Sequence, residues 1–184
     1  MLFPEIKPAI RSEYEELTHH GSPIGSKMLD FWKWSMSNIL GNTDRGALAE
    51  FIVATAVGFE QSMRNDWGGY DLTADNGRIK IEVKSAAYIQ TWEQSKLSNI
   101  IFNTKAPVST NTRPSDIYVF CLLKHKEQET IDPLKLEQWE FYVLQTETLN
   151  RYERSKVCIT LNSLRKLTDA ISYSQLRDII LDYK

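Results

Sequence analysis

The stretch GYDLTADNGRIKIEVKSA, from Gly69 to Ala86, contains the strongest local folding signal in the chain. Asn76-Gly77 separates two runs in which apolar and polar residues alternate, and this dipeptide is typical of a two-residue β-hairpin turn. A turn at this point places Leu72 opposite Ile81 and Asp71 opposite Glu82. The stretch therefore predicts a hairpin, and the arrangement of its charges is the first indication of function.

The two faces of this hairpin differ sharply, because side chains alternate between the faces of a strand. The apolar face would contain Leu72, Ala74, Ile79, Ile81 and Val83, and the charged face Asp71, Thr73, Lys80, Glu82 and Lys84. Directly opposed Cβ atoms lie about 4.5–5.5 Å apart, and like charges so placed repel each other. The pair of Asp71 and Glu82 therefore requires a compensating positive charge.

Two interpretations of the charged face remain open from the residues alone. In one, Lys80 and Lys84 lie diagonal to Asp71 and form a solvated charge ladder, in which each pair contributes less than about 1 kcal/mol. In the other, Asp71, Glu82 and the Val83 carbonyl bind a divalent cation such as Mg²⁺, which prefers oxygen ligands. Lys84 would then orient an attacking water or stabilise charge on a phosphoryl oxygen.

A third acid lies in a predicted helix over roughly residues 44–57. Glu50 is the only charged residue between Gly46 and Gly58, and its neighbours are almost all apolar. A buried carboxylate needs a cation, a hydrogen-bond donor or a proton. Glu50 is therefore a candidate member of the same site; the alternatives are a narrow solvent-exposed stripe or an ion pair with Arg45 or Arg64.

Glu50, Asp71 and the triplet Glu82-Val83-Lys84 together resemble the motif set of the PD-(D/E)xK, or restriction-endonuclease-like, nuclease superfamily. That pattern is a helix with an acid, a strand bearing Asp, and a hairpin into a strand bearing Glu-x-Lys. Tyr70 stands in place of the proline that gives the superfamily its name. The likeness covers most of residues 28–150, which are similar to a group of uncharacterised bacterial proteins with this core. Residues 151–184 would form a C-terminal helical extension.

The resemblance implies a four-stranded mixed sheet flanked by helices and Mg²⁺-dependent hydrolysis of phosphodiester bonds, with Mn²⁺ as an alternative cation. It implies that Asp71 and Glu82 ligate the metal and that Lys84 positions or activates the water. Glu50 would hold a second metal or reach the first through water. Gln90 is the last candidate: if the strand continues past Lys84, Gln90 lies on the active face by parity; otherwise it is a surface glutamine.

The rest of the chain predicts one α/β or α+β domain. A helix is expected over residues 29–40, with an inward aromatic face of Leu29, Trp32, Met36 and Leu40. Strands are expected at 99–103, 116–123 and 139–146, the second of them buried on both faces. A polar loop covers residues 103–115, and the tail from residue 162 has helical spacing.

The composition sets limits on the class of protein. The chain has 184 residues, of which 42% are hydrophobic and 25% charged, as in an ordinary globular domain. It shows neither a secretory signal nor a membrane span, and its two cysteines lack metal-binding spacing, so a reduced cytoplasmic setting is expected. The net charge of −2 neither indicates nor excludes nucleic-acid binding.

DNA would therefore be bound through loops rather than through overall charge. The candidates are residues 64–70, Lys96, Lys105, Asn111 and Arg113, with Trp67 and Tyr70 able to stack on bases or sugars. The leading hypothesis is a metal-dependent DNA endonuclease, for which analogy suggests a homodimer. The alternatives are a non-catalytic nucleic-acid-binding or protein-interaction module, and a nuclease acting on RNA or branched DNA.

Overall fold

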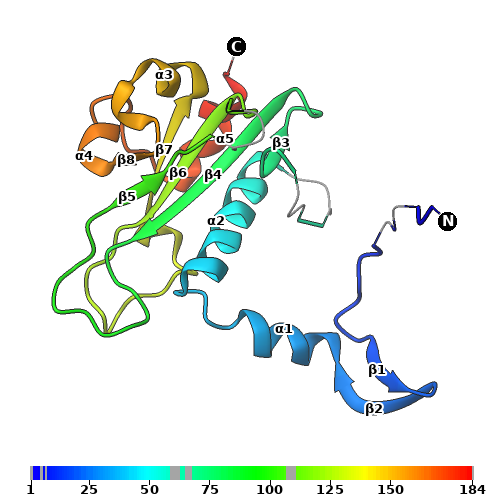
Figure 1. Ribbon diagram of the computed structural model, residues 1–184. Coiled ribbons are helices and arrows are strands. Elements are labelled where there is room, and N and C mark those ends of the chain that lie inside the picture. Colours follow the sequence, from blue (N-terminus) through cyan, green and yellow to red (C-terminus); the bar gives the residue numbers. More distant parts are fainter. Residues whose placement is uncertain are drawn as a thin grey trace.

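A four-stranded mixed sheet forms the centre of the molecule (Figure 1). The computed structural model describes residues 2–4, 6, 8–58, 63–64, 68–106 and 111–183. The strand order is β3-β4-β6-β7, with bounds Leu72–Ala74, Ile79–Ala87, Ile117–Leu123 and Trp139–Gln145. β3 is antiparallel to β4, β4 is parallel to β6, and β6 is antiparallel to β7. The predicted mixed sheet is thus confirmed.

The β3–β4 hairpin has the register that the sequence predicts. Leu72 pairs with Ile81, and Ala74 pairs with Ile79. In the turn, Asp75, Asn76 and Gly77 have φ angles of 51°, 54° and 84°. Such left-handed angles favour Gly, Asn and Asp, so the turn residues themselves fix the register.

Each face of the sheet is covered by a different set of elements. The odd-numbered residues of β4, β6 and β7 pack with α2 (Asn42–Val57) and α5 (Tyr173–Leu181). The even-numbered residues of β6 and β7 pack with β5 (Ile101–Asn103), β8 (Cys158–Thr160) and the α3–α4 region. These last two helices are Thr146–Arg151 and Leu161–Leu164, and short 3₁₀ turns lie at Leu136–Gln138 and Glu153–Ser155. The sheet is therefore buried on both faces, and all seven residues of β6 are buried, as predicted.

The C-terminal segment belongs to this core. Leu176 and Ile180 of α5 are fully buried in the same cluster as α2. β8 forms a separate two-stranded antiparallel sheet with β5. β5 lies in the long connection between the parallel strands β4 and β6, whose described residues contain no helix.

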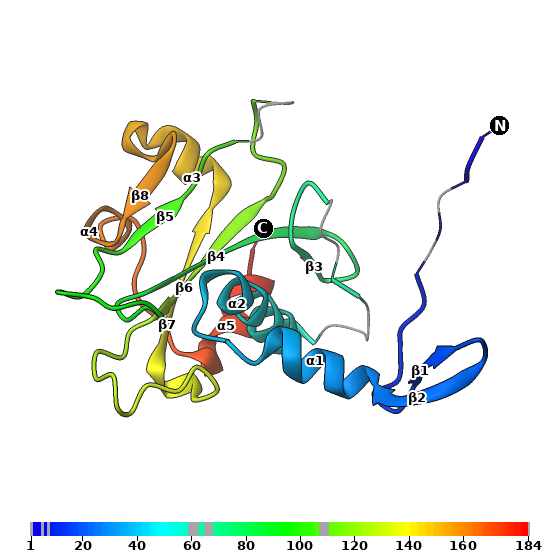
Figure 2. The same cartoon turned by 60° about the horizontal axis from the view of Figure 1, so that its bottom comes forward.

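The N-terminal segment stands away from the body in both views (Figure 2). It consists of the hairpin β1 (Glu16–His19) and β2 (Ser22–Lys27), followed by α1 (Met28–Met36). The prediction of an inward aromatic face is wrong: no residue of α1 is buried, and Leu29 and Met36 of that face are 36% and 45% exposed. The β1–β2 hairpin is exposed along its whole length. Its turn follows from His20 and Gly21, which have φ angles of 50° and 81°. No helix in the described part of the chain is long and apolar enough to cross a membrane.

Candidate functional site

Asp71 lies immediately before β3 and is held at both its backbone and its side chain. Its N–H donates to the Ile81 carbonyl at 3.0 Å, and its Oδ2 accepts the Val83 N–H at 2.7 Å. β3 begins opposite Ile81, so the Asp71 carboxylate takes the position of a strand partner for Val83. Because alternate residues of a strand direct both backbone groups to the same edge, the Val83 carbonyl is directed to this edge as well.

Glu82 and Lys84 lie on the face of β4 opposite α2, because they have the other parity from Ile81 and Val83. Both side chains are partly buried, with exposed fractions of 18% for Glu82 and 28% for Lys84, and the Lys84 Nζ forms an ion pair with Glu82 Oε1. Burial raises the pKa of Glu82, the Lys84 charge lowers it, and the charges of Asp71 and Glu50 raise it further. The charges of the two other acids named by the sequence therefore act on Glu82.

Glu50 has a cationic partner within the protein. It is buried in α2, where Arg64 Nε contacts its Oε2 at 2.6 Å and Arg64 Nη2 contacts its Oε1 at 2.8 Å. Pairing with Arg64 was one of the alternatives left open by the sequence. The other basic candidate, Arg45, instead donates to the Leu40 carbonyl at 2.9 Å and to Asn42 Oδ1 at 2.7 Å.

A cleft of about 610 Å³ lies between α2 and the β3–β4 hairpin. Its lining includes Glu50, Arg64, Tyr70, Asp71 and the turn residues Asp75, Asn76 and Gly77. The Lys80 ammonium lies 5.6 Å from the centre of the Tyr70 ring. The cleft therefore combines two of the predicted acids with cationic and aromatic groups at the same edge of the sheet.

The donor set fits a single hard cation better than two. Asp71, Glu82 and the Val83 carbonyl are the oxygen ligands that Mg²⁺ prefers. Both Glu50 oxygens already contact Arg64, so Glu50 is not placed as a further ligand. Across the described ranges, no group of three or more His, Cys, Asp or Glu side chains is arranged to hold a metal ion.

Gln90 lies beyond β4, which ends at Ala87, so the condition under which parity would place it on the active face is not met. The Gln90 amide donates to the Ala87 carbonyl at 2.8 Å, and its Oε1 accepts from Arg45 at 3.4 Å. Gln90 thus ties the loop after β4 to the start of α2.

The predicted substrate-binding residues are in different situations. Lys96, Lys105 and Asn111 are exposed, whereas Trp67 lies outside the described residues. Arg113 donates to the carbonyls of Thr104 at 2.9 Å and Ser155 at 2.7 Å and also bonds to Asn150 Oδ1. This arginine is therefore engaged in holding its loop against the α3–β8 region.

Sequence reasoning missed Tyr118, which is the β6 partner of Glu82 in the sheet register. Burial, followed by the charge of Glu82, raises the pKa of Tyr118 to about 12. Tyr118 lies in a continuous apolar run that predicts a buried strand and carries no separate signal. Only the pairing of β4 with β6 brings its phenol beside the acid.

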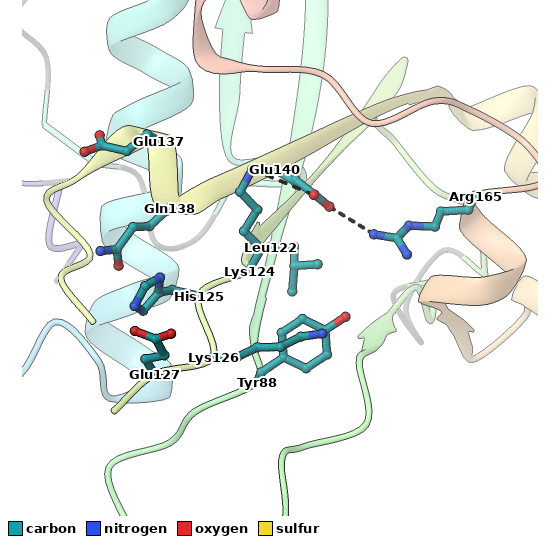
Figure 3. Close-up of a pocket in the computed structure, with 10 residues that line it drawn as sticks. All are labelled: Tyr88, Leu122, Lys124, His125, Lys126, Glu127, Glu137, Gln138, Glu140 and Arg165. Atoms are coloured by element: carbon teal, nitrogen blue, oxygen red, sulfur yellow. Dashed lines mark hydrogen bonds and ion pairs between the residues drawn. The ribbon is translucent and has the colours of Figure 1, made fainter. Parts of the chain in front are cut away.

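A second cleft, also of about 610 Å³, lies beyond the opposite end of β6 (Figure 3). The Glu140 carboxylate lies 3.1 Å from Arg165 and 3.8 Å from Lys124, and Lys126 Nζ lies 4.6 Å from the centre of the Tyr88 ring. Its lining has as many Glu as Lys and Arg side chains, so formal charge favours neither anions nor cations. None of the predicted site residues lines it.

Comparison with known proteins does not identify a function for the chain. No protein-family model matches the chain, and no curated protein matches it in sequence. The chemistry of the Asp71–Glu82–Lys84 edge and the adjoining cleft is therefore the basis on which a function is proposed.

Proposed function

We propose that the protein is a nuclease with a restriction-endonuclease-like core that uses a divalent cation to hydrolyse phosphodiester bonds in DNA. The observation that carries the proposal is the arrangement at one edge of the sheet. Asp71 is fixed on the Val83 N–H, its charge acts on Glu82, and Lys84 contacts Glu82. Two mutually repelling acids with an adjacent ammonium form a charge pattern suited to phosphoryl chemistry.

Asp71, Glu82 and the Val83 carbonyl would hold Mg²⁺, or Mn²⁺ in its place. When bound, such a cation polarises a phosphoryl oxygen and lowers the pKa of its water. Glu50 lies outside this set because Arg64 occupies both of its oxygens. The proposal is therefore a site with one cation, in contrast to the second metal that the family resemblance allows.

Lys84 is the candidate catalytic cation of the protein itself. In the structure its ammonium is held by Glu82. Once that carboxylate is engaged elsewhere, the ammonium is available to hold the attacking water or to stabilise negative charge on a phosphoryl oxygen. Lys80 and Tyr70 would contact the DNA backbone beside it, since local cationic groups suffice on a protein of net charge −2. A homodimer and a cytoplasmic location belong to the same proposal.

The test is cleavage of supercoiled plasmid and single-stranded DNA with Mg²⁺, Mn²⁺ or EDTA. We expect the wild type to cleave only with a divalent cation, and Lys84→Ala and Asp71→Asn to lose at least about 100-fold in rate, the lower range for general acid–base groups. Lys166→Ala removes an exposed lysine from the α4–α5 region and serves as the matched control. Circular dichroism of each variant separates lost chemistry from lost fold.

A catalytically silent nucleic-acid-binding or protein-interaction module is the second candidate. It is favoured by the internal charge balance, because Glu82 is paired with Lys84 and Glu50 with Arg64. Absence of cleavage by the folded wild type on plasmid, single-stranded DNA and RNA, with either cation, would replace the nuclease by this module.

A further inference from the structure

The ion pair between Arg64 and Glu50 is asymmetric in its access to solvent. The Glu50 side chain is only 11% exposed, whereas the Arg64 side chain is 49% exposed. Both line the cleft that also contains Tyr70 and Asp71. The cation is thus accessible from the cleft, while the carboxylate lies behind it in α2.

The geometry of the pair is one that a phosphate can reproduce. Arg64 uses Nε and Nη2 to contact the two Glu50 oxygens at 2.6 Å and 2.8 Å, which is a bidentate fork. The same planar fork binds two oxygens of a phosphate group. A phosphodiester that enters the cleft would therefore compete with Glu50 for the same donors.

We propose that Arg64 is a phosphate-binding residue of this cleft, which Glu50 holds in place until nucleic acid binds. The inference rests on the proposed function for its choice of nucleic acid as the source of the phosphate. It does not depend on cleavage. It gives the Glu50–Arg64 pair a role in recognition, which the motif resemblance does not assign.

This exchange couples two binding events. When Arg64 turns to a phosphate, the buried Glu50 carboxylate loses part of its compensation, which is unfavourable. A divalent cation held by Asp71 and Glu82 would add positive charge at the edge of the cleft that Asp71 and Glu50 both line. Divalent cation and nucleic acid should therefore each tighten the binding of the other, because coupling between sites is reciprocal.

The test is the fluorescence anisotropy of labelled duplex and single-stranded DNA, titrated with protein in EDTA and in Ca²⁺ over a series of salt concentrations. We expect Arg64→Gln to weaken binding by about tenfold, the effect of one lost charge-assisted contact. The dependence of log K on log salt should become shallower by about 1. Glu50→Gln, which removes the charge that competes with phosphate for Arg64, should tighten binding in EDTA and reduce the effect of Ca²⁺.

The matched controls come from an exposed ion pair on α3. Arg151→Gln and Glu147→Gln make the same charge changes where both side chains are mostly exposed, and each should change the dissociation constant less than about twofold. Arg64→Lys keeps a cation beside Glu50, so this variant can be tested in place of Arg64→Gln if the latter does not fold. It should keep the salt dependence of the wild type and bind more weakly.

Two results would overturn the inference. The first is an Arg64→Gln variant that keeps the affinity and the salt dependence of the wild type, or an Arg64→Lys variant that keeps its affinity. Either result would make the ion pair purely structural. The second is a wild-type protein that binds neither duplex nor single-stranded DNA. Anisotropy measures binding and does not require cleavage. If the variants bind as expected but the protein cuts no DNA, Arg64 remains a phosphate ligand and only the proposed nuclease activity is rejected.

Discussion

Asp71 accepts the backbone N–H of Val83 at 2.7 Å, just before the point where β3 begins. One carboxylate thus completes the edge of the sheet and stands beside Glu82. Asp71 therefore has a structural role, and under the proposed function it also holds the cation, so its variants must separate the two.

Asp71→Asn should retain much of the stability, and Asp71→Ala should not. The Asn carbonyl can still accept from Val83, whereas Ala leaves that N–H without its partner, at a cost of about 1–3 kcal/mol. Urea denaturation measures the difference. We expect Mg²⁺ to raise the melting temperature of the wild type, because a ligand specific to the native state raises its stability. Both variants should lose this increase. Asp75→Asn, in the exposed turn, should keep it.

Glu82→Gln should stabilise the protein at neutral pH. Burial raises the pKa of Glu82 above its ordinary value of 4.5, so the ionised form is less favourable in the folded protein than in the unfolded chain. The stability that the protonated Glu82 carboxyl contributes is fully present below pH 4.5, and it is lost as the pH rises through the folded pKa. The advantage of Gln should therefore shrink as the pH falls toward 4.5 in denaturation series. A constant difference across pH would contradict it.

Removing either partner of the Glu50–Arg64 pair should have unequal effects on stability. Arg64→Gln leaves a buried carboxylate without its cation and should cost about 1–3 kcal/mol. Glu50→Gln should cost less, because the half-exposed Arg64 can be hydrated. A double-mutant cycle should give a coupling energy of about 0.5–3 kcal/mol. The same cycle on Arg151 and Glu147 should give less than about 1 kcal/mol.

Two tyrosines should ionise late in an alkaline titration. Burial is the largest cause that raises the pKa of Tyr118 and of Tyr142 to about 12. The ultraviolet absorbance of phenolate that appears near that pH should therefore be smaller in Tyr118→Phe than in the wild type. Since both folded pKa values are raised, the stability that these groups contribute is lost as the pH rises from about 10 to about 12.

Deleting residues 2–27 should leave the stability of the body within about 0.5 kcal/mol of the wild type. No residue of β1 or β2 is buried, and the segment stands away from the sheet (Figure 2). Thermal unfolding of the shortened protein measures this directly. A loss of several degrees in melting temperature would show that the segment packs against the body in solution.

Local chemistry determined the part of the fold around the candidate site. The turn residues Asn76 and Gly77 accept left-handed backbone angles, and the alternation beside them set the register from Leu72 to Ile81. The same periodicity placed Glu82 and Lys84 on one face and Ile81 and Val83 on the other. The apolar run of β6 also predicted its burial, because a strand covered on both faces needs no polar side.

Tertiary structure decided the partners of the charged groups and the extent of each element. Whether Glu50 meets Arg45, Arg64 or a metal depends on how distant segments pack, and the amino-acid sequence contains all three options. The end of β4 at Ala87 and the exposure of α1 depend on neighbours that no local pattern specifies. Local periodicity fixes which way a side chain points from its own strand or helix. What that side chain meets there depends on contacts between segments far apart in the chain.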